Sequence, residues 1–516
     1  MFQSSLLAHF LIIVILSLYG CGGSSSGDDD IDPGNGGLDT PSDGSSDGGD
    51  DSGSDGDGGD DAGSNEPAQL ILSPHPENTL MVNASVITEE NAKVVIKFES
   101  EATEPHQVTL NEFSTEHSST IVGLRASTTY QFTTVSTYEN GNVVESEPVD
   151  FTTGGLPSGV PATEVVTHTA QSEGGITIFA PATTNSGRFW GVDEEGEVVW
   201  YLHDDVPLSG TPAARYLGDG RIMLLLNSEA RIITFAGETL QTYDLPPYHH
   251  DAILLDTGNL LVLTYQRQTI GNSMLQGDVI VEIDPKGNTV WRWSAFDHLD
   301  TNRFPGGLST HVSDNGSMDW THSNSLFYQS DDDTIMISSR SQSWVINIDH
   351  KTGEVVWIMG DSDGNTVDNL ENKFLSLTSG SWMASQHAAM LTDNGQVLIY
   401  DNRNEAELSG DIHNSRAVRY NINTNQMTAE QDWEFITPKY TQSLDDVDEL
   451  DNGNILITAG GPSTPGSGGG STSHIIEVTP NSPSTAVWEM EVNQTFIYRT
   501  ERIKWQELEK FSSLEN

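Results

Sequence analysis

Three histidines and one aspartate stand at matching distances ahead of apolar segments that each follow a polar turn. The spacings are ten residues from His250 to Leu260, ten from His387 to Val397, twelve from His322 to Thr334 and ten from Asp445 to Ile455. A neutral imidazole can act as a nucleophile, and neighbouring imidazoles can act as acid or base. The repeated placement therefore predicts that these side chains meet in one reactive site.

An arginine joins this set. Arg340 ends the apolar segment that begins at Thr334, and in an antiparallel hairpin the end of one strand neighbours the start of the strand before it. We therefore expect Arg340 beside His322. A guanidinium offers a fork of donors that matches tetrahedral oxyanions, which indicates transfer of an anionic group. Two alternatives stay open: the histidines pack structurally between strands, or three of them hold zinc or copper, which the arginine disfavours.

The segments that carry these residues repeat six times. The first repeating unit is a turn followed by an apolar strand, with copies that start at Glu173, Gly218, Asp256, Asp331, Asp393 and Asp451. The second unit is a strand, a polar turn and a strand, with copies at Phe189–Trp200, Ile232–Tyr243, Val279–Trp293, Val345–Trp357, Ala417–Trp433 and Ile475–Trp488. Four strands per repeat make one propeller blade. We expect an all-β chain with a six-bladed β-propeller over 160–505; a pair of β-sandwiches is the alternative.

A smaller β domain is expected ahead of the propeller, over residues 68–154. Its expected strands are Leu80–Val86, Lys93–Glu99, Thr120–Val122, Thr129–Ser136 and Val149–Phe151. The run Leu124–Phe132 resembles the tyrosine corner of fibronectin type III domains, in which a Tyr hydroxyl ties back to the backbone. We expect a fibronectin type III-like β-sandwich that serves as a spacer or supports a homodimer.

The N-terminal residues resemble an export signal. Leu6–Tyr19 is apolar but too short to span a membrane, and it fits the core of a signal peptide. It runs into Leu18-Tyr19-Gly20-Cys21, which resembles the bacterial lipobox. We expect a signal peptide over 1–21 with lipidation at Cys21, and a disordered Gly/Ser/Asp tether over 22–66. This predicts an exported protein, lipid-anchored to a bacterial membrane on the periplasmic side or at the cell surface.

Composition excludes several classes of partner. Asp and Glu number 76 against 22 Lys and Arg, a formal charge of −54. Such a charge repels phosphate backbones, so we expect no nucleic-acid partner. Cys21 is the one cysteine, which excludes a disulfide within the chain and a Cys₄ zinc site. A Gly-rich phosphate loop is missing from the sequence, and we expect no cofactor and no metal in the reactive site.

Six motifs within the expected propeller, residues 160–505, occur in an order typical of a known family. They are His249-His250-Asp251, Asp319-Trp320-Thr321-His322-Ser323-Asn324-Ser325, Ser338-Ser339-Arg340-Ser341-Gln342-Ser343, Gln386-His387-Ala388, Tyr400-Asp401-Asn402 and Tyr498-Arg499-Thr500-Glu501-Arg502-Ile503. This set, spread over about 160–505, resembles the bacterial arylsulfate sulfotransferases of the aryl-sulfate:phenol type. The resemblance implies an exported six-bladed propeller with a small N-terminal β domain.

The resemblance also implies an activity. A sulfuryl group would move from an aryl sulfate to a phenol by a ping-pong mechanism, without a nucleotide sulfate donor. His387 matches the histidine that takes the sulfuryl group, and His322 and Arg340 match the residues that hold its oxygens. His250 matches a residue at the phenolic oxygen. Spacing favours His250 over His249 as the residue that faces the channel.

Other readings stay open. The segment around Tyr498, Arg499 and Arg502 either closes the last blade or edges the site, and we leave it out of the catalytic set. The alternative functions are a non-catalytic cell-surface propeller that binds protein or glycan, and a metal-dependent propeller hydrolase or lyase.

Overall fold

The computed structural model describes residues 65–182, 187–204, 213–218, 220–306, 309–313, 315–404, 414–461 and 472–511. The signal segment with Cys21 and the tether, except its residues 65 and 66, lie outside these described residues. None of the helices in this part of the chain is long and apolar enough to cross a membrane. The chain is all-β here, with short helices at α1 (Ala295–His298), α2 (Asp368–Glu371) and α4 (Trp505–Phe511).

The N-terminal strands form one curled sheet. They are β1 (Gln69–Pro74), β2 (Val82–Ser100), β3 (Thr103–Ile121), β4 (Thr129–Tyr138), β5 (Val143–Glu145) and β6 (Val149–Thr152). Long β2 pairs with β1 and β3 at its start and with β3 and β4 towards its end. It thereby joins six strands into a single sheet, where the sequence predicts a sandwich of two sheets.

Two features of this sheet bear on the sequence predictions. The expected strand Lys93–Glu99 and all but the first two residues of the expected strand Leu80–Val86 are parts of continuous β2. Most of β3 was not predicted, because few of its side chains are buried. The predicted hydroxyl-to-backbone tie is present, since the Arg125 backbone N–H donates to the Tyr130 hydroxyl at 2.9 Å.

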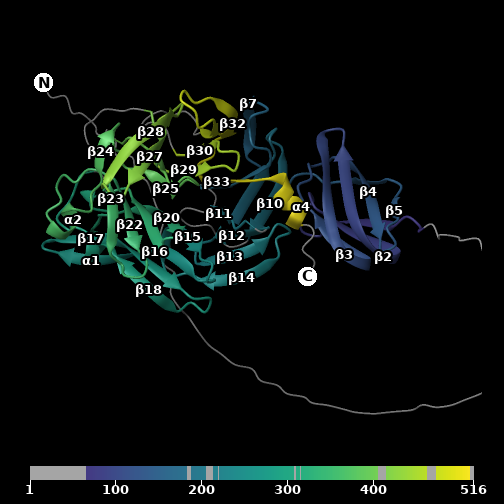
Figure 1. Cartoon of the computed structure of the whole chain (residues 1–516), viewed down its shortest axis with the longest axis horizontal. Helices are drawn as coiled ribbons and strands as arrows, with labels where there is room; N and C mark the ends of the chain where they lie inside the picture. The colour runs from purple at the N-terminus through teal and green to yellow at the C-terminus, as the bar shows by residue number, and fades with distance from the viewer. Residues whose placement is uncertain are drawn as a thin grey trace, which may run out of the picture. The chain divides into compact units, whose positions relative to one another are not determined.

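Six further antiparallel sheets of four strands are found within the described residues (Figure 1). Sheet 1 contains β8 (Ile176–Pro181), β9 (Gly187–Val192), β10 (Val198–Asp204) and β33 (Ile497–Ile503). Sheet 2 contains β11 (Ala213–Tyr216), β12 (Arg221–Leu225), β13 (Glu229–Thr234) and β14 (Thr239–Asp244). Sheet 3 contains β15 (Tyr248–Leu254), β16 (Leu260–Ile270), β17 (Ser273–Ile283) and β18 (Thr289–Ser294).

The other three sheets repeat this plan. Sheet 4 contains β20 (Ser323–Gln329), β21 (Thr334–Ser339), β22 (Trp344–Asp349) and β23 (Val355–Met359). Sheet 5 contains β25 (His387–Leu391), β26 (Val397–Asp401), β27 (Arg416–Asn423) and β28 (Thr428–Ile436). Sheet 6 contains β29 (Asp445–Glu449), β30 (Ile455–Ala459), β31 (Thr472–Val478) and β32 (Ala486–Asn493). All six predicted repeats thus appear as four-stranded sheets, the plan of a propeller blade.

Three sheets carry a fifth strand at the outer edge. β19 (Ser317–Asp319) pairs parallel to β17, and β24 (Ser376–Ser379) pairs parallel to β28. β7 (Ala162–His168) pairs antiparallel to β32, so the start of the repeat region joins sheet 6. β33 supplies the first strand of sheet 1 by pairing with β8. The segment around Tyr498 therefore closes the first repeat and not the last.

The second strand of each sheet shows why these segments fold as they do. β26 and β30 are buried at every position because neighbouring sheets cover both of their faces. The first strands, in contrast, contact the first strands of neighbouring sheets. These contacts join β33 to β11, β15 to β20, β20 to β25, β25 to β29 and β29 to β33. In Figure 1 these first strands lie together, between the outer strands of the sheets. Side chains that begin them are thus brought to one place.

Candidate active site

The structure places the predicted histidines at the start of three first strands. His250 lies in β15, His322 directly precedes β20, and His387 begins β25. Asp445 begins β29 in the same way. These strands are neighbours, so side chains far apart in sequence share one end of the sheets, as the spacing predicted.

The backbone is irregular at each histidine. The pairing register shifts between Tyr248 and Ala252, between Ser323 and Ser325, and between His387 and Ala389. Positive φ accompanies the shifts, at 61° for His250, 46° for His322 and 47° for Ala388. Such bulges redirect a side chain, and each left-handed non-glycine residue costs about 1–3 kcal/mol that surrounding packing must offset. Strained backbone is thus present at the point where each of the three histidines leaves its strand.

The histidines and the predicted arginine lie within electrostatic reach of one another. The His250 and His322 ring centroids are 4.9 Å apart. The Arg340 backbone N–H donates to the His322 carbonyl at 3.1 Å, so the arginine and histidine meet as expected. Burial, the positive charge of Arg340 and then His322 and Arg499 lower the pKa of His387 well below its usual value. His387 is therefore a neutral imidazole, the form that can attack an electrophile.

The tautomer of His387 is set by Asn402. His387 Nδ1 donates to Asn402 Oδ1 at 2.7 Å. The Asn402 amide cannot turn over, because its Nδ2 donates to Asp445 Oδ2 at 2.5 Å and to the Thr441 carbonyl at 3.0 Å. Asp445 is itself fixed by the Gly460 backbone N–H at 3.0 Å. The lone pair of His387 therefore lies on Nε2.

His322 is held by a carboxylate in a similar way. Its Nδ1 donates to Asp319 Oδ2 at 2.5 Å. Burial opposes ionisation of Asp319, but the charge of His322 and its hydrogen bond, with His249 and Arg340, hold the pKa of this carboxyl below its usual value. Because Asp319 accepts from Nδ1, the lone pair of a neutral His322 lies on its other ring nitrogen, Nε2.

A second arginine, which the sequence reasoning left out, also borders the site. Arg499 in β33 donates to both carboxylate oxygens of Asp251 at 3.0 Å and to the Asn324 carbonyl at 3.0 Å. Arg215 of β11 donates to the same carboxylate at 2.9 Å. The charge of Arg499 contributes to the lowered pKa of both His250 and His387. No signal in the sequence indicated this, because β7 precedes the first turn at the spacing of an inner strand and only the structure shows that it joins sheet 6.

Asn402 is a further site residue that the sequence analysis did not predict. The argument that pairs Arg340 with His322 also pairs Asn402 with His387, because each follows the second strand of its hairpin. Gln342 and Gln386 instead bond backbone groups: Gln342 Nε2 bonds the Trp320 carbonyl, and Gln386 Nε2 bonds the Trp344 carbonyl. They hold neighbouring sheets together.

Comparison with known proteins identifies the family to which this cluster of histidines and arginines belongs. The sequence model described as "Arylsulfotransferase (ASST)" matches residues 162–499, which is more than half of the chain. The chain belongs to the arylsulfotransferase family.

Curated relatives within the arylsulfotransferases are distant. The chain is 23% identical over 311 residues to the arylsulfate sulfotransferase AssT of Escherichia coli O6:H1, covering 47% of this chain and 52% of that protein. It is 24% identical over 312 residues to AssT of Lelliottia amnigena, with the same coverage. The chain thus spans about half the length of the curated relatives it matches.

Solved structures that superpose on part of this chain have still lower sequence identity. A Bacteroides caccae protein of unknown function is 16% identical with a TM-score of 0.39, covering 64% of this chain and 98% of that one. The β-propeller domain of Cps50 (Swd1) from Myceliophteria thermophila is 11% identical with a TM-score of 0.32, covering 66% and 89%. These TM-scores are too low to relate the chains further.

One group of side chains in this arylsulfotransferase is close enough to share a metal ion, among the residues that the structure describes. The nitrogen and carboxylate oxygens of His474, Glu489 and Glu491 lie within 4.8 Å of one another on β31 and β32. His474 Nδ1 already donates to Glu489 at 3.0 Å. The group contains none of the predicted site histidines.

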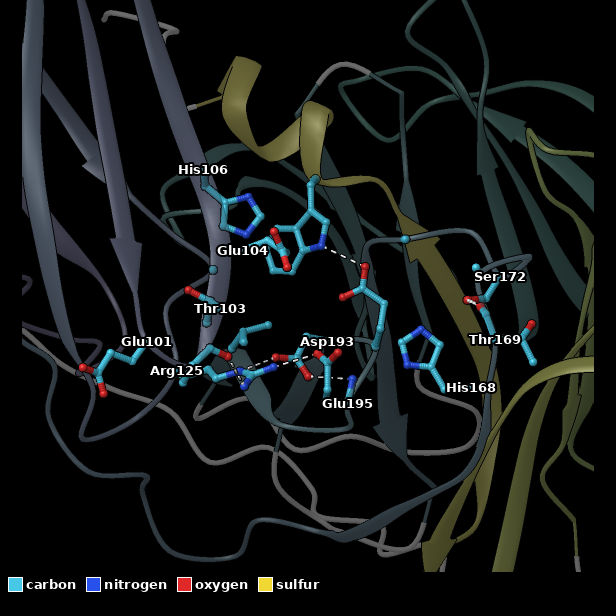
Figure 2. A pocket seen from close by; sticks show the side chains of 17 residues that line it. Glu101, Thr103, Glu104, His106, Arg125, His168, Thr169, Ser172, Asp193 and Glu195 are labelled. Carbon is cyan, nitrogen blue, oxygen red and sulfur yellow. Dashed lines mark hydrogen bonds and ion pairs between the residues drawn. The ribbon is translucent and has the colours of Figure 1, made fainter.

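A cavity of about 490 Å³ lies between the N-terminal sheet and sheet 1 of this arylsulfotransferase (Figure 2). Arg125 crosses it, donating to Asp193 at 2.6 Å and to Glu195 at 2.7 Å. Trp505 of α4 donates to Glu194 at 3.0 Å and packs on His106. These charges are paired within the cavity walls, so we interpret the cavity as the junction where the N-terminal sheet docks.

Proposed function

We propose that this arylsulfotransferase transfers a sulfuryl group from an aryl sulfate to a phenol through a sulfohistidine at His387. The observation that carries the proposal is the neutral His387, whose Nδ1 is held by Asn402 and whose pKa is lowered by burial and by the charges of Arg340 and His322. Family membership and distant similarity to AssT support the same reaction class. We further propose that the six sheets close into a six-bladed propeller.

The proposed reaction has two half-reactions. In the first, His387 Nε2 attacks sulfur, the bond from sulfur to the aryl oxygen breaks, and a phenol leaves. In the second, another phenol takes the sulfuryl group and regenerates His387. Arg340 and His322 stabilise charge on the sulfuryl oxygens, and donors fixed in advance at such a site contribute about 10²–10³-fold each. His250 donates a proton to the phenolic oxygen that leaves and accepts the proton of the phenol that attacks.

Two buried arginines offset the repulsion between the negatively charged chain and an anionic substrate. The chain carries a strongly negative net charge, which disfavours anions at a distance. The buried guanidinium groups of Arg340 and Arg499 supply positive charge at the site itself. We propose that export and a lipid anchor at Cys21 place this site on the outer side of a bacterial membrane.

The test is turnover of 4-nitrophenyl sulfate by the purified chain, with and without an added phenol. We expect release of 4-nitrophenol that depends on the acceptor, and a 4-nitrophenyl sulfate-derived adduct on the His387 peptide by mass spectrometry at neutral pH. His387→Ala should abolish both. A folded protein that releases no 4-nitrophenol with any phenol present would refute the proposal and leave a binding or metal-dependent role in its place.

A further inference from the structure

His249, next to the predicted His250, has its own set of partners. Its Nε2 faces two acceptors, the Asp278 carboxylate at 3.3 Å and the Thr264 carbonyl at 3.3 Å. Its Nδ1 lies 2.8 Å from His250 Nδ1. Because both partners of Nε2 only accept, this nitrogen carries a proton. The two Nδ1 atoms then share one further proton across a short hydrogen bond.

Asp278 is well placed to support a charge on His249. Its second oxygen accepts from the Ser323 backbone N–H at 2.5 Å, and its own backbone N–H donates to Thr321 Oγ1 at 2.9 Å. The carboxylate is buried and cannot turn away. Its position relative to His249 is therefore fixed by sheet 4 as well as by sheet 3, to which it belongs.

His250 has the opposite environment. Burial and the charges of His322, His249, His387 and Arg499 lower its pKa well below the usual value. It cannot hold a proton as an imidazolium while it waits for substrate. The departing phenolate nevertheless needs a proton, since an ordinary phenol has a pKa of about 10.

The groups that face His249 favour its protonated form. They are Asp278 from β17, Asp319 at the end of β19, the Thr264 carbonyl and Tyr265 ring from β16, and His250. Burial alone would lower the pKa of His249, but the hydrogen bond and charge of Asp278, together with Asp319, raise it. Adjacent imidazoles thus differ in proton affinity, and the one with the higher affinity lies behind the one at the site.

We propose that Asp278, His249 and His250 form a proton relay, in which His249 stores the proton that His250 delivers to the phenolic oxygen. This inference rests on the proposed function. It assigns roles to His249 and Asp278, which the proposed reaction leaves without one. His250 touches the substrate oxygen, while His249 and Asp278 act through His250 as positioning residues.

The relay balances in both half-reactions. As His387 Nε2 bonds to sulfur, the electron pair of the broken bond goes to the aryl oxygen, which takes the proton from His250 Nε2. His249 Nδ1 passes its proton to His250 Nδ1, so His250 changes tautomer without ever becoming charged, and His249 becomes neutral. When the acceptor phenol attacks, its proton enters at His250 Nε2 and the shift reverses. No net proton is taken from solvent.

The test varies the leaving group. A proton delivered to the aryl oxygen matters greatly when the phenol is weakly acidic and little when its phenolate is already stable. We expect His249→Gln to lower kcat/KM for phenyl sulfate by about 100-fold or more, within the range for a lost general acid. Its loss on 4-nitrophenyl sulfate should be only a few fold. Asp278→Asn should show the same dependence on the leaving group, and it carries the test if His249→Gln does not fold.

A matched control is His350→Gln. His350 is also a partly buried histidine between two carboxylates, Glu282 and Asp333, outside the site. We expect the His350→Gln variant to show the same dependence of kcat/KM on the leaving group as the wild type. Equal losses on both substrates in His249→Gln and Asp278→Asn would overturn the relay while leaving sulfuryl transfer intact. A wild-type protein without turnover of either substrate would overturn the proposed function, and the relay with it.

Discussion

The hydrogen bond from His387 to Asn402 can be turned into a charge contact by one substitution. Asn402→Asp keeps an acceptor 2.7 Å from His387 Nδ1 and replaces the amide that donates to Asp445. Two buried carboxylates in contact cannot both be ionised, so the new carboxyl and Asp445 share one proton. Their remaining charge is most stable beside an imidazolium. The substitution should therefore favour the protonated, non-nucleophilic form of His387.

The size of the effect follows from the short contact. An opposite charge within about 4–6 Å raises the pKa of a histidine by ~1–3 units, and one unit corresponds to about 1.36 kcal/mol. In the wild type the pKa of His387 lies well below its usual value, so the imidazole is neutral across the neutral pH range. In the variant the protonated form persists to higher pH. The acid limb of the rate profile should move upward by ~1–3 pH units.

The assay is kcat/KM for 4-nitrophenyl sulfate from pH 5 to pH 9, with a saturating phenol. Asn347→Asp serves as the matched control, because Asn347 is a buried amide on sheet 4 that bonds Thr334 outside the site. It adds the same charge and should leave the acid limb in place. An acid limb in Asn402→Asp that coincides with the wild-type limb would refute the claim that Asn402 sets the protonation state of His387.

Three further predictions concern other charged groups. Burial raises the pKa of Asp445 to about 8. Between about pH 4 and pH 8 the folded protein therefore keeps a proton that the unfolded chain has released. The free energy of unfolding should fall as the pH rises through this window. Asp445→Asn should flatten that slope in urea unfolding measured at several pH values. Arg340→Lys removes the fork of donors and should lower kcat/KM by about 10²–10³-fold, with wild-type thermal stability as the check on folding. Arg125→Ala leaves buried Asp193 unpaired and should destabilise the docked N-terminal sheet by an amount near the low end of about 3–5 kcal/mol, because Arg125 is partly exposed; unchanged thermal unfolding would contradict this.

The repeat pattern was readable from sequence because apolar strands and polar turns alternate in every copy. The second strands are buried on both faces, so their residues are almost all apolar, and the turns that precede them contain Gly or Asp. The same periodicity gave the position of His250, His322 and His387 at the starts of first strands. Strands with mostly exposed side chains, such as β3, carry no such pattern and were missed.

The partners of the histidines could not be predicted in the same way. Asp278 and His249 meet because the register of β15 shifts against β16. The sequence contains no pattern that predicts this bulge. Arg499 reaches the site because β33 joins a sheet whose other strands lie more than 290 residues earlier in the sequence. Pairing of that kind depends on how the sheets close, which local spacing does not record.

The pairing of β33 with β8 makes the first sheet depend on the last strand of the described chain. Until residues 497–503 have emerged, sheet 1 ends at an open edge at β8 and Asp251 lacks one of its two guanidinium partners. The other described strands can pair within their own sheets without β33, but the histidine cluster then lacks Arg499. A chain cut short before residue 497 would thus carry His250, His322 and His387 without the guanidinium of Arg499 beside them.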